Sequence, residues 1–199
     1  MYAAIEYARN GWSVIPGSVW DGHAYTLGTT PTKTDGLVPS MVSQRSYRNA
    51  REVHSWWNVA PYSILSRVAE DFDVIQIPAG LLATSIEFAR QSIIKSPVVI
   101  GPFGARILVS RGAELLPGLW NDLGIDIMPP GVFIPLPPTT IRAGSTRWLR
   151  EPSELNYQLG DQKAVQEALL EVQQLWKIQR VFEFDARSNS SVSDRFDSA

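Results

Sequence analysis

The clearest hydrophobic pattern in the chain is a short alternating stretch, Phe72 to Gly80, which reads FDVIQIPAG. One face of this stretch carries Phe72, Val74 and Gln76, and the other face carries Asp73, Ile75 and Ile77. Alternation with period two that ends at proline and glycine predicts a strand followed by a turn. We expect this strand to be central in its sheet, with Gln76 and Pro78 at the end where strands usually carry functional groups.

Further alternating or apolar runs predict a sheet around that strand. The predicted strands are Trp12–Pro16, Tyr62–Arg67, Pro97–Ile100, Arg106–Ser110, Ile125–Ile127, Val132–Leu136 and Thr146–Leu149. Gly101 to Gly104 separates two of them and predicts a hairpin with a longer turn. The stretch from Gly17 to Ser40 is rich in Gly, Thr and Pro, which predicts a long loop or a loop with short strands.

Helical spacing of apolar residues predicts helices on either side of this sheet. Tyr2–Arg9 is followed by Asn10-Gly11, a common helix stop. Asn49 caps the next helix, in which Val53, Trp56 and Trp57 share a face. The tryptophan pair can stack bases or pack in the core, and its helical spacing favours the core.

Three more helices are predicted after the central strand. Ala79–Lys95 has Leu82, Ile86, Ala89 and Ile93 at helical spacing and should cover the sheet. Glu114–Leu123 predicts a short helix that Pro117 interrupts early. Asp161 caps a long helix to Arg180, whose apolar stripe is Val165, Leu169, Val172 and Trp176. We expect that stripe to pack on the body of the protein, the alternative being a partner. The fold class is therefore α+β, with a mixed or antiparallel sheet, flanking helices and a C-terminal helix.

Composition and charge limit the number of domains and the classes of partner that the chain can have. The 199 residues, 44% hydrophobic and 19% charged, suit one globular domain or a domain with a tail. A net charge of -2 and a pI near 5.7 give no global field that attracts nucleic acid, so any such site must be local. The chain has no Cys, no leader pattern and no apolar run of about 20 residues, so we expect a cytosolic protein without membrane contact.

Candidate chemistry outside the central strand is weak. His23 lies in the polar loop without a second ligand at a convincing spacing, so a surface position is favoured over a general base or metal ligand. His54 points away from the apolar face of its helix. Glu70 and Asp71 are interpreted as solvated turn charges at the start of the central strand.

Three segments carry a resemblance to a known family. The opening YAAIEYARNGWSVIP, the segment HSWWNVAP and the segment GIDIMPPGVFIPLPPT together resemble, in order, the N-terminal domain of bifunctional DNA primase/polymerases, which belong to the archaeo-eukaryotic primase superfamily. The resemblance covers roughly Tyr2 to Pro152. It implies a primase/polymerase-like fold and a DNA-directed nucleotidyltransferase that uses Mg or Mn, with two aspartates ending the central strand, a phosphate-contacting His and a third carboxylate.

Carried over residue by residue, the two aspartate positions fall on Gln76 and Pro78, and the histidine position falls on Arg106. Only Asp126 keeps a carboxylate. A register shifted by five residues instead brings Asp71 and Asp73 into the paired positions, but at the start of the strand, where the family does not place its acids. One carboxylate cannot replace three around two cations, so we expect nucleotidyl transfer to be lost or very weak, and no cofactor.

The resulting hypothesis is a degenerate, stand-alone primase/polymerase-like protein that binds DNA or a nucleotide. Residues 1–152 form that domain, residues 153–184 a helical extension that packs on it, and residues 185–199 a disordered tail. Arg106, Arg142, Arg147 and Arg150 are candidates for an anion site, although scattered surface arginines are the simpler interpretation. Two alternatives remain: a module that binds a protein partner through the C-terminal helix, and an active polymerase with a rearranged metal site.

Overall fold

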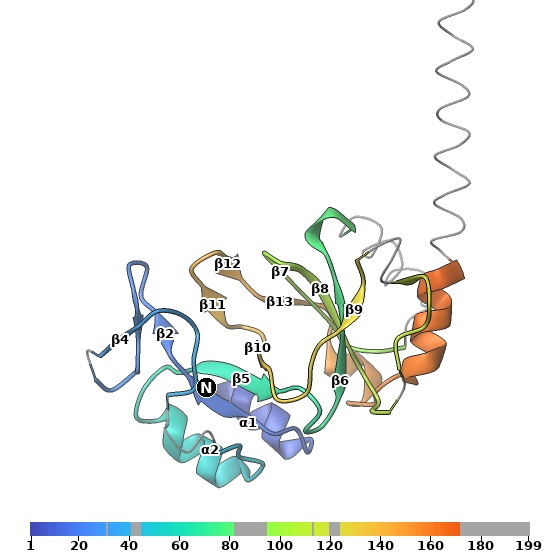
Figure 1. Cartoon of the computed structure of the whole chain (residues 1–199). Helices are drawn as coiled ribbons and strands as arrows, with labels where there is room; N and C mark the ends of the chain where they lie inside the picture. The colour runs from blue at the N-terminus through green and yellow to red at the C-terminus, as the bar shows by residue number, and fades with distance from the viewer. Residues whose placement is uncertain (31, 41–44, 82–94, 113, 120–123, 172–199) are drawn as a thin grey trace, which may run out of the picture.

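The predicted central strand is an inner strand of a five-stranded antiparallel sheet (Figure 1). The structure is a computed structural model that describes residues 1–30, 32–40, 45–81, 95–112, 114–119 and 124–171. The strand order is β13-β7-β8-β6-β9. Their bounds are β6 Asp73–Ile77, β7 Val98–Gly101, β8 Gly104–Val109, β9 Asp126–Ile127 and β13 Arg147–Arg150. The middle strand is therefore β8, and β6 lies beside it.

Three smaller sheets complete the described strands. One has the order β1-β5-β10, with β1 Ile15–Gly17, β5 Ser63–Arg67 and β10 Phe133–Pro135. A second joins β2 Val19–Trp20, β3 Tyr25–Thr26 and β4 Lys33–Thr34, so the predicted long loop does hold short strands. The third is a hairpin of β11 Thr140–Ile141 and β12 Gly144–Ser145. All the strand pairs in these sheets are antiparallel.

The helices end and begin where their caps predict. The described helices with full bounds are α1 Tyr2–Arg9, α2 Ala50–Trp57, and the 3-10 turns η1 Ala79–Leu81 and η2 Pro152–Leu155. Asn49 caps α2 by accepting a hydrogen bond from the backbone N–H of Arg51 at 2.9 Å. Within the described ranges, each helix is too short or too polar to cross a lipid bilayer.

The two faces of the five-stranded sheet bury two separate cores. Because side chains alternate along a strand, Val74 and Leu108 face a core shared with α1, α2 and β5. Ile75 and Ile107 face the opposite core. Trp57 is buried in the first core and its neighbour Trp56 packs against it, so the packing interpretation of the tryptophan pair is confirmed. The α+β fold class is confirmed as well.

The second core is covered by a C-terminal helix that starts after Asp161. Asp161 caps it by accepting from the N–H of Ala164 at 2.8 Å, and residues 162–171 are helical. Val165 and Leu169 are buried against the sheet, as the stripe predicts. The rest of that stripe, Val172 and Trp176, lies outside the described residues.

Two local predictions differ from the structure. Residues 114–118 are not helical, because Pro117-Gly118 forms a turn in which Gly118 has a φ of +97°. The β7–β8 turn is tight, with Gly101 paired to Gly104, since both strands run to the glycines. Of the predicted helix Ala79–Lys95, the structure describes only η1 and Lys95. The predicted tail, residues 185–199, lies outside the described residues.

Candidate functional site

Gln76, Arg106 and Asp126 meet in one row across the five-stranded sheet. Gln76 of β6 pairs with Arg106 of β8 on one side and with Asp126 of β9 on the other. The row continues through Val99 of β7 to Trp148 of β13. Gln76 follows Val74 at a spacing of two, so the row lies on the face toward α1 and α2. Gln76 is therefore the direct neighbour of both Arg106 and Asp126, three positions that the family resemblance singles out.

Arg106 and Gln76 are joined by a side-chain hydrogen bond. The Nε–H of Arg106 donates to Oε1 of Gln76 at 2.9 Å. The orientation of the amide follows from its other contacts, because Nε2 donates toward the carbonyl oxygens of Ile77 and Phe103 at 3.1 Å each and of Ala105 at 3.3 Å. Gln76 therefore holds Arg106 in place but, as a neutral amide, does not offset its positive charge.

The charge of Arg106 is not balanced by an acidic side chain in the part of the chain that the structure describes, where the two salt bridges are Arg48–Asp71 and Lys163–Glu167. The side chain is half-buried, and burial lowers the pKa of Arg106 from its usual value. An arginine still remains cationic at neutral pH. A half-buried guanidinium with a neutral partner is a site that an anion can complete.

Asp126 forms no ion pair with Arg106 among the described residues, although both side chains lie on the same face of the sheet. Two strand spacings separate it from Arg106, about 9.5 Å between the backbones. Its Oδ1 accepts from the N–H of Ile127 at 2.7 Å. One carboxylate beside an amide and a guanidinium does not fit Mg or Mn, which bind clustered oxygen ligands. Among the described residues, no three His, Cys, Asp or Glu side chains gather as a metal site.

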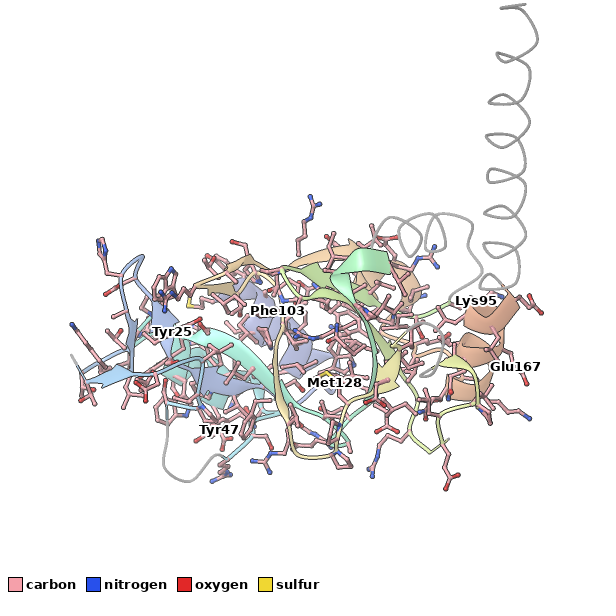
Figure 2. All side chains as sticks on the ribbon, turned by 45° about the horizontal axis from the view of Figure 1, so that its top comes forward. Tyr25, Tyr47, Lys95, Phe103, Met128 and Glu167 are labelled. Carbon is pink, nitrogen blue, oxygen red and sulfur yellow. The ribbon has the colours of Figure 1, made fainter. Side chains whose placement is uncertain are left out.

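The other aspartate position, Pro78, lies just beyond the end of β6. Its carbonyl accepts from the N–H of Leu81 at 3.0 Å in the η1 turn. Its ring offers no ligand atom. The neighbouring β7–β8 turn carries Phe103, a residue that is 58% exposed. Figure 2 labels it. Sequence reasoning missed Phe103, although a large apolar residue between Pro102 and Gly104 is a signal that it lies outside the sheet.

The remaining candidate arginines are spread out. Arg147 of β13 pairs with Ile100, which places it on the face opposite to Arg106. Arg142 lies in the turn of the β11–β12 hairpin and is exposed, and its backbone N–H donates to the Tyr25 hydroxyl at 2.9 Å. Arg150 ends β13 after a bulge. Of the four candidate arginines, Arg106 is therefore the one that lies in the row with Gln76 and Asp126.

The alternative register, Asp71 with Asp73, has a structural role. Asp71 accepts from the backbone N–H and the hydroxyl of Ser13 and pairs with Arg48, and its side chain is 7% exposed. Asp73 accepts from the N–H of Gly112 at 3.1 Å. The interpretation of Asp71 as a solvated charge was therefore wrong, because the start of β6 is tied to the segment after α1. Glu70 is half-buried and accepts from the Ser46 hydroxyl.

Both histidines lie at the surface. His23 is exposed in the loop between β2 and β3, where its backbone N–H donates to Asp21 at 2.8 Å. His54 is exposed on α2. Neither belongs to the row around Arg106.

No family model, curated protein or solved structure matches this chain. The chemistry of the row therefore has to be inferred from its own residues.

Proposed function

We propose that this chain is a primase/polymerase-like protein that binds a nucleotide or DNA through phosphate at Arg106 and does not transfer nucleotides. The observation that carries the proposal is the half-buried Arg106 guanidinium, which is held by the neutral amide of Gln76 and has no salt bridge among the described residues. A phosphate oxygen accepts well from the remaining N–H groups of such a guanidinium.

The family resemblance supports phosphate as the anion. It makes Arg106 equivalent to a His that contacts nucleotide phosphate, and Gln76 and Asp126 equivalent to acids near that phosphate. The strand pairing that joins these three positions follows from the backbone and does not depend on the resemblance.

The replacement of acids by neutral groups supports binding without chemistry. Two cations about 4 Å apart need several carboxylates to offset their repulsion. Here one position is an amide bonded to a cation, a second is proline, and Asp126 alone is acidic. An active polymerase with a rearranged metal site would need acids from elsewhere in the chain.

The protein-interaction alternative has less support in the part of the C-terminal helix that the structure describes. Over residues 162–171 the apolar residues Val165 and Leu169 are buried, and the exposed positions include Lys163, Glu167 and Glu171 (Figure 2 labels Glu167). This face offers no apolar stripe to a partner.

The test is equilibrium binding of the full-length protein to a labelled single-stranded oligodeoxynucleotide and to a nucleoside triphosphate. Arg106→Gln should weaken both by about tenfold or more, since it removes a charged hydrogen bond to phosphate. Arg147→Gln makes the same charge change on the opposite face and should leave the affinity close to wild type. Binding to DNA should weaken as salt rises.

Two results would overturn the proposal. Equal losses in the two variants would mean that any surface arginine contributes and that Arg106 forms no site. Template-dependent primer extension with Mg or Mn, abolished by Asp126→Ala, would show that the chain is an active polymerase.

A further inference from the structure

A small pocket lies between α1, the end of β13 and η2, and its Trp148 is two strands away from Arg106 along the same row. Its volume is about 190 Å³. Its lining combines the rings of Tyr7, Trp148 and Tyr157 with three prolines and the carboxylates of Glu6 and Glu151. This combination of aromatic walls and carboxylates has no role in phosphate binding, because it repels anions.

The aromatic walls belong to one packed cluster. Tyr7 meets Trp148 edge to face, with ring centroids 6.1 Å apart. Trp12 lies behind them and contacts Tyr157 edge to face at 5.4 Å. Tyr7 and Trp12 are buried, and Trp148 and Tyr157 are half-buried at the pocket. The walls are therefore held by the core.

The polar edges of these rings are already bonded. The Tyr7 hydroxyl donates to the carbonyl of Pro137 at 2.7 Å and accepts from Nε1 of Trp148 at 2.8 Å. The Tyr157 hydroxyl donates to Oε1 of Glu6 at 2.9 Å. The rings therefore offer apolar and π surface to a ligand. The Glu151 carboxylate accepts from the Ser153 hydroxyl at 3.2 Å and caps η2, so Glu151 and Glu6 each use part of their acceptor capacity and keep the rest for a ligand.

Two negative charges stand at this surface, and neither has a basic partner in the described part of the chain. Neither Glu6 nor Glu151 forms a salt bridge with any residue that the structure describes. Both line the pocket together with Tyr7. Burial raises the pKa of Tyr7, the hydrogen bond from Trp148 lowers it, and the charges of Glu6 and Glu151 raise it further. Burial and the bond to Glu6 likewise raise the pKa of Tyr157. The phenols stay neutral, and the pocket carries net negative charge at neutral pH.

We infer that this pocket binds a primary alkylammonium group, such as the side chain of a lysine on a partner protein. Aromatic faces attract organic cations, and two carboxylates accept the N–H groups of an ammonium head. The prolines and rings suit its methylene stem. The volume lies below the roughly 300–1,000 Å³ of pockets for whole drug-sized molecules, which favours a single side chain.

The experiment uses ¹⁵N-labelled full-length protein and n-butylammonium, which reproduces the end of a lysine side chain. The indole N–H signal of Trp148, identified by its loss in Trp148→Phe, should shift saturably with n-butylammonium and not with n-butanol. A peptide with one lysine and free putrescine form two further arms, which distinguish a protein ligand from a polyamine.

Charge-removing variants decide the outcome. Glu6→Gln and Glu151→Gln keep their hydrogen-bond acceptors, and each should weaken n-butylammonium binding a few-fold, with about tenfold for the pair. Glu114→Gln with Glu171→Gln, both exposed elsewhere, is the matched control and should bind as wild type does. The single variants still decide the question where the double variant does not fold. Absence of a shift with n-butylammonium, an equal shift with n-butanol, or unchanged affinity in the pocket variants would overturn the inference.

Discussion

Arg106 and Gln76 face each other across β8 and β6, and the guanidinium Nε–H donates to the amide oxygen at 2.9 Å. A carboxylate in place of Gln76 would form a salt bridge with Arg106 and neutralise its positive charge within the protein. The amide leaves that charge available. An amide and an acid of nearly the same shape therefore differ in whether Arg106 can attract an anion from solution.

Gln76→Glu should therefore weaken anion binding at Arg106. The new carboxylate gives Arg106 an internal counter-ion, so affinity for DNA and for a nucleoside triphosphate should fall about tenfold or more. The measurement is fluorescence anisotropy with the labelled oligonucleotide. Gln158→Glu makes the same change at an exposed position and is the control. Equal affinity of Gln76→Glu and wild type would argue against Arg106 as the anion site.

Gly104→Ala should destabilise the fold strongly. Gly104 has a φ of +109°, and an added Cβ would lie 2.0 Å from the carbonyl oxygen of Ile77. Backbone strain and the clash together should lower the free energy of unfolding by about 2 kcal/mol or more. Denaturant unfolding measures this loss. Gly36→Ala meets no atom within 4 Å and should stay within about 1 kcal/mol of wild type; similar losses in both variants would contradict the close approach.

Leu169→Ala should show that the C-terminal helix supports the body of the protein. Leu169 is buried in the core under the sheet with Ile107 and Leu119, so its truncation should cost about 2–5 kcal/mol of unfolding free energy. Lys163→Ala, on the exposed side of the helix, should cost about 0.5 kcal/mol or less. Unfolding curves and light scattering are measured together. Unchanged stability with a loss of dimers would instead assign the helix to a partner.

Alkaline pH should destabilise the protein through Tyr7 and Tyr157. Burial first, and nearby carboxylates after it, raise the pKa of both phenols above the usual value of about 10. The folded state thus favours the neutral phenol, so this stability is complete below about pH 10 and is lost as the pH rises further. Unfolding free energy measured from pH 8 to 11 should fall less steeply in Tyr157→Phe than in Tyr2→Phe, whose ring is exposed. Parallel pH profiles would contradict this assignment.

Much of the sheet was predictable because its signals are local. The alternation around Val74 and Ile75 predicted β6, and the glycines around Phe103 predicted the β7–β8 hairpin. The caps Asn49 and Asp161 marked the starts of two helices. The family resemblance singled out Gln76, Arg106 and Asp126 one by one, but their arrangement in one row is known only from the strand pairing.

The rest depends on contacts that leave no periodic signal. The two-residue strands β11 and β12 are too short for alternation to appear. Asp71 reads as a turn charge, yet it is buried by Ser13 and Arg48, which lie 58 and 23 residues away in sequence. Tyr7 and Trp148 are 141 residues apart, so their pocket could not be read from spacing.

Phosphate binding at Arg106 can be followed through the NMR signal of its Nε–H group while the protein is titrated with a nucleoside triphosphate. This N–H donates to Gln76, and its signal is identified by its loss in Arg106→Gln. We predict a saturable shift of this signal at the same ligand concentrations that saturate binding, with no shift of the Arg147 signal. A protein that binds the nucleotide while the Arg106 signal stays still, or that binds equally well as Arg106→Gln, would contradict this prediction.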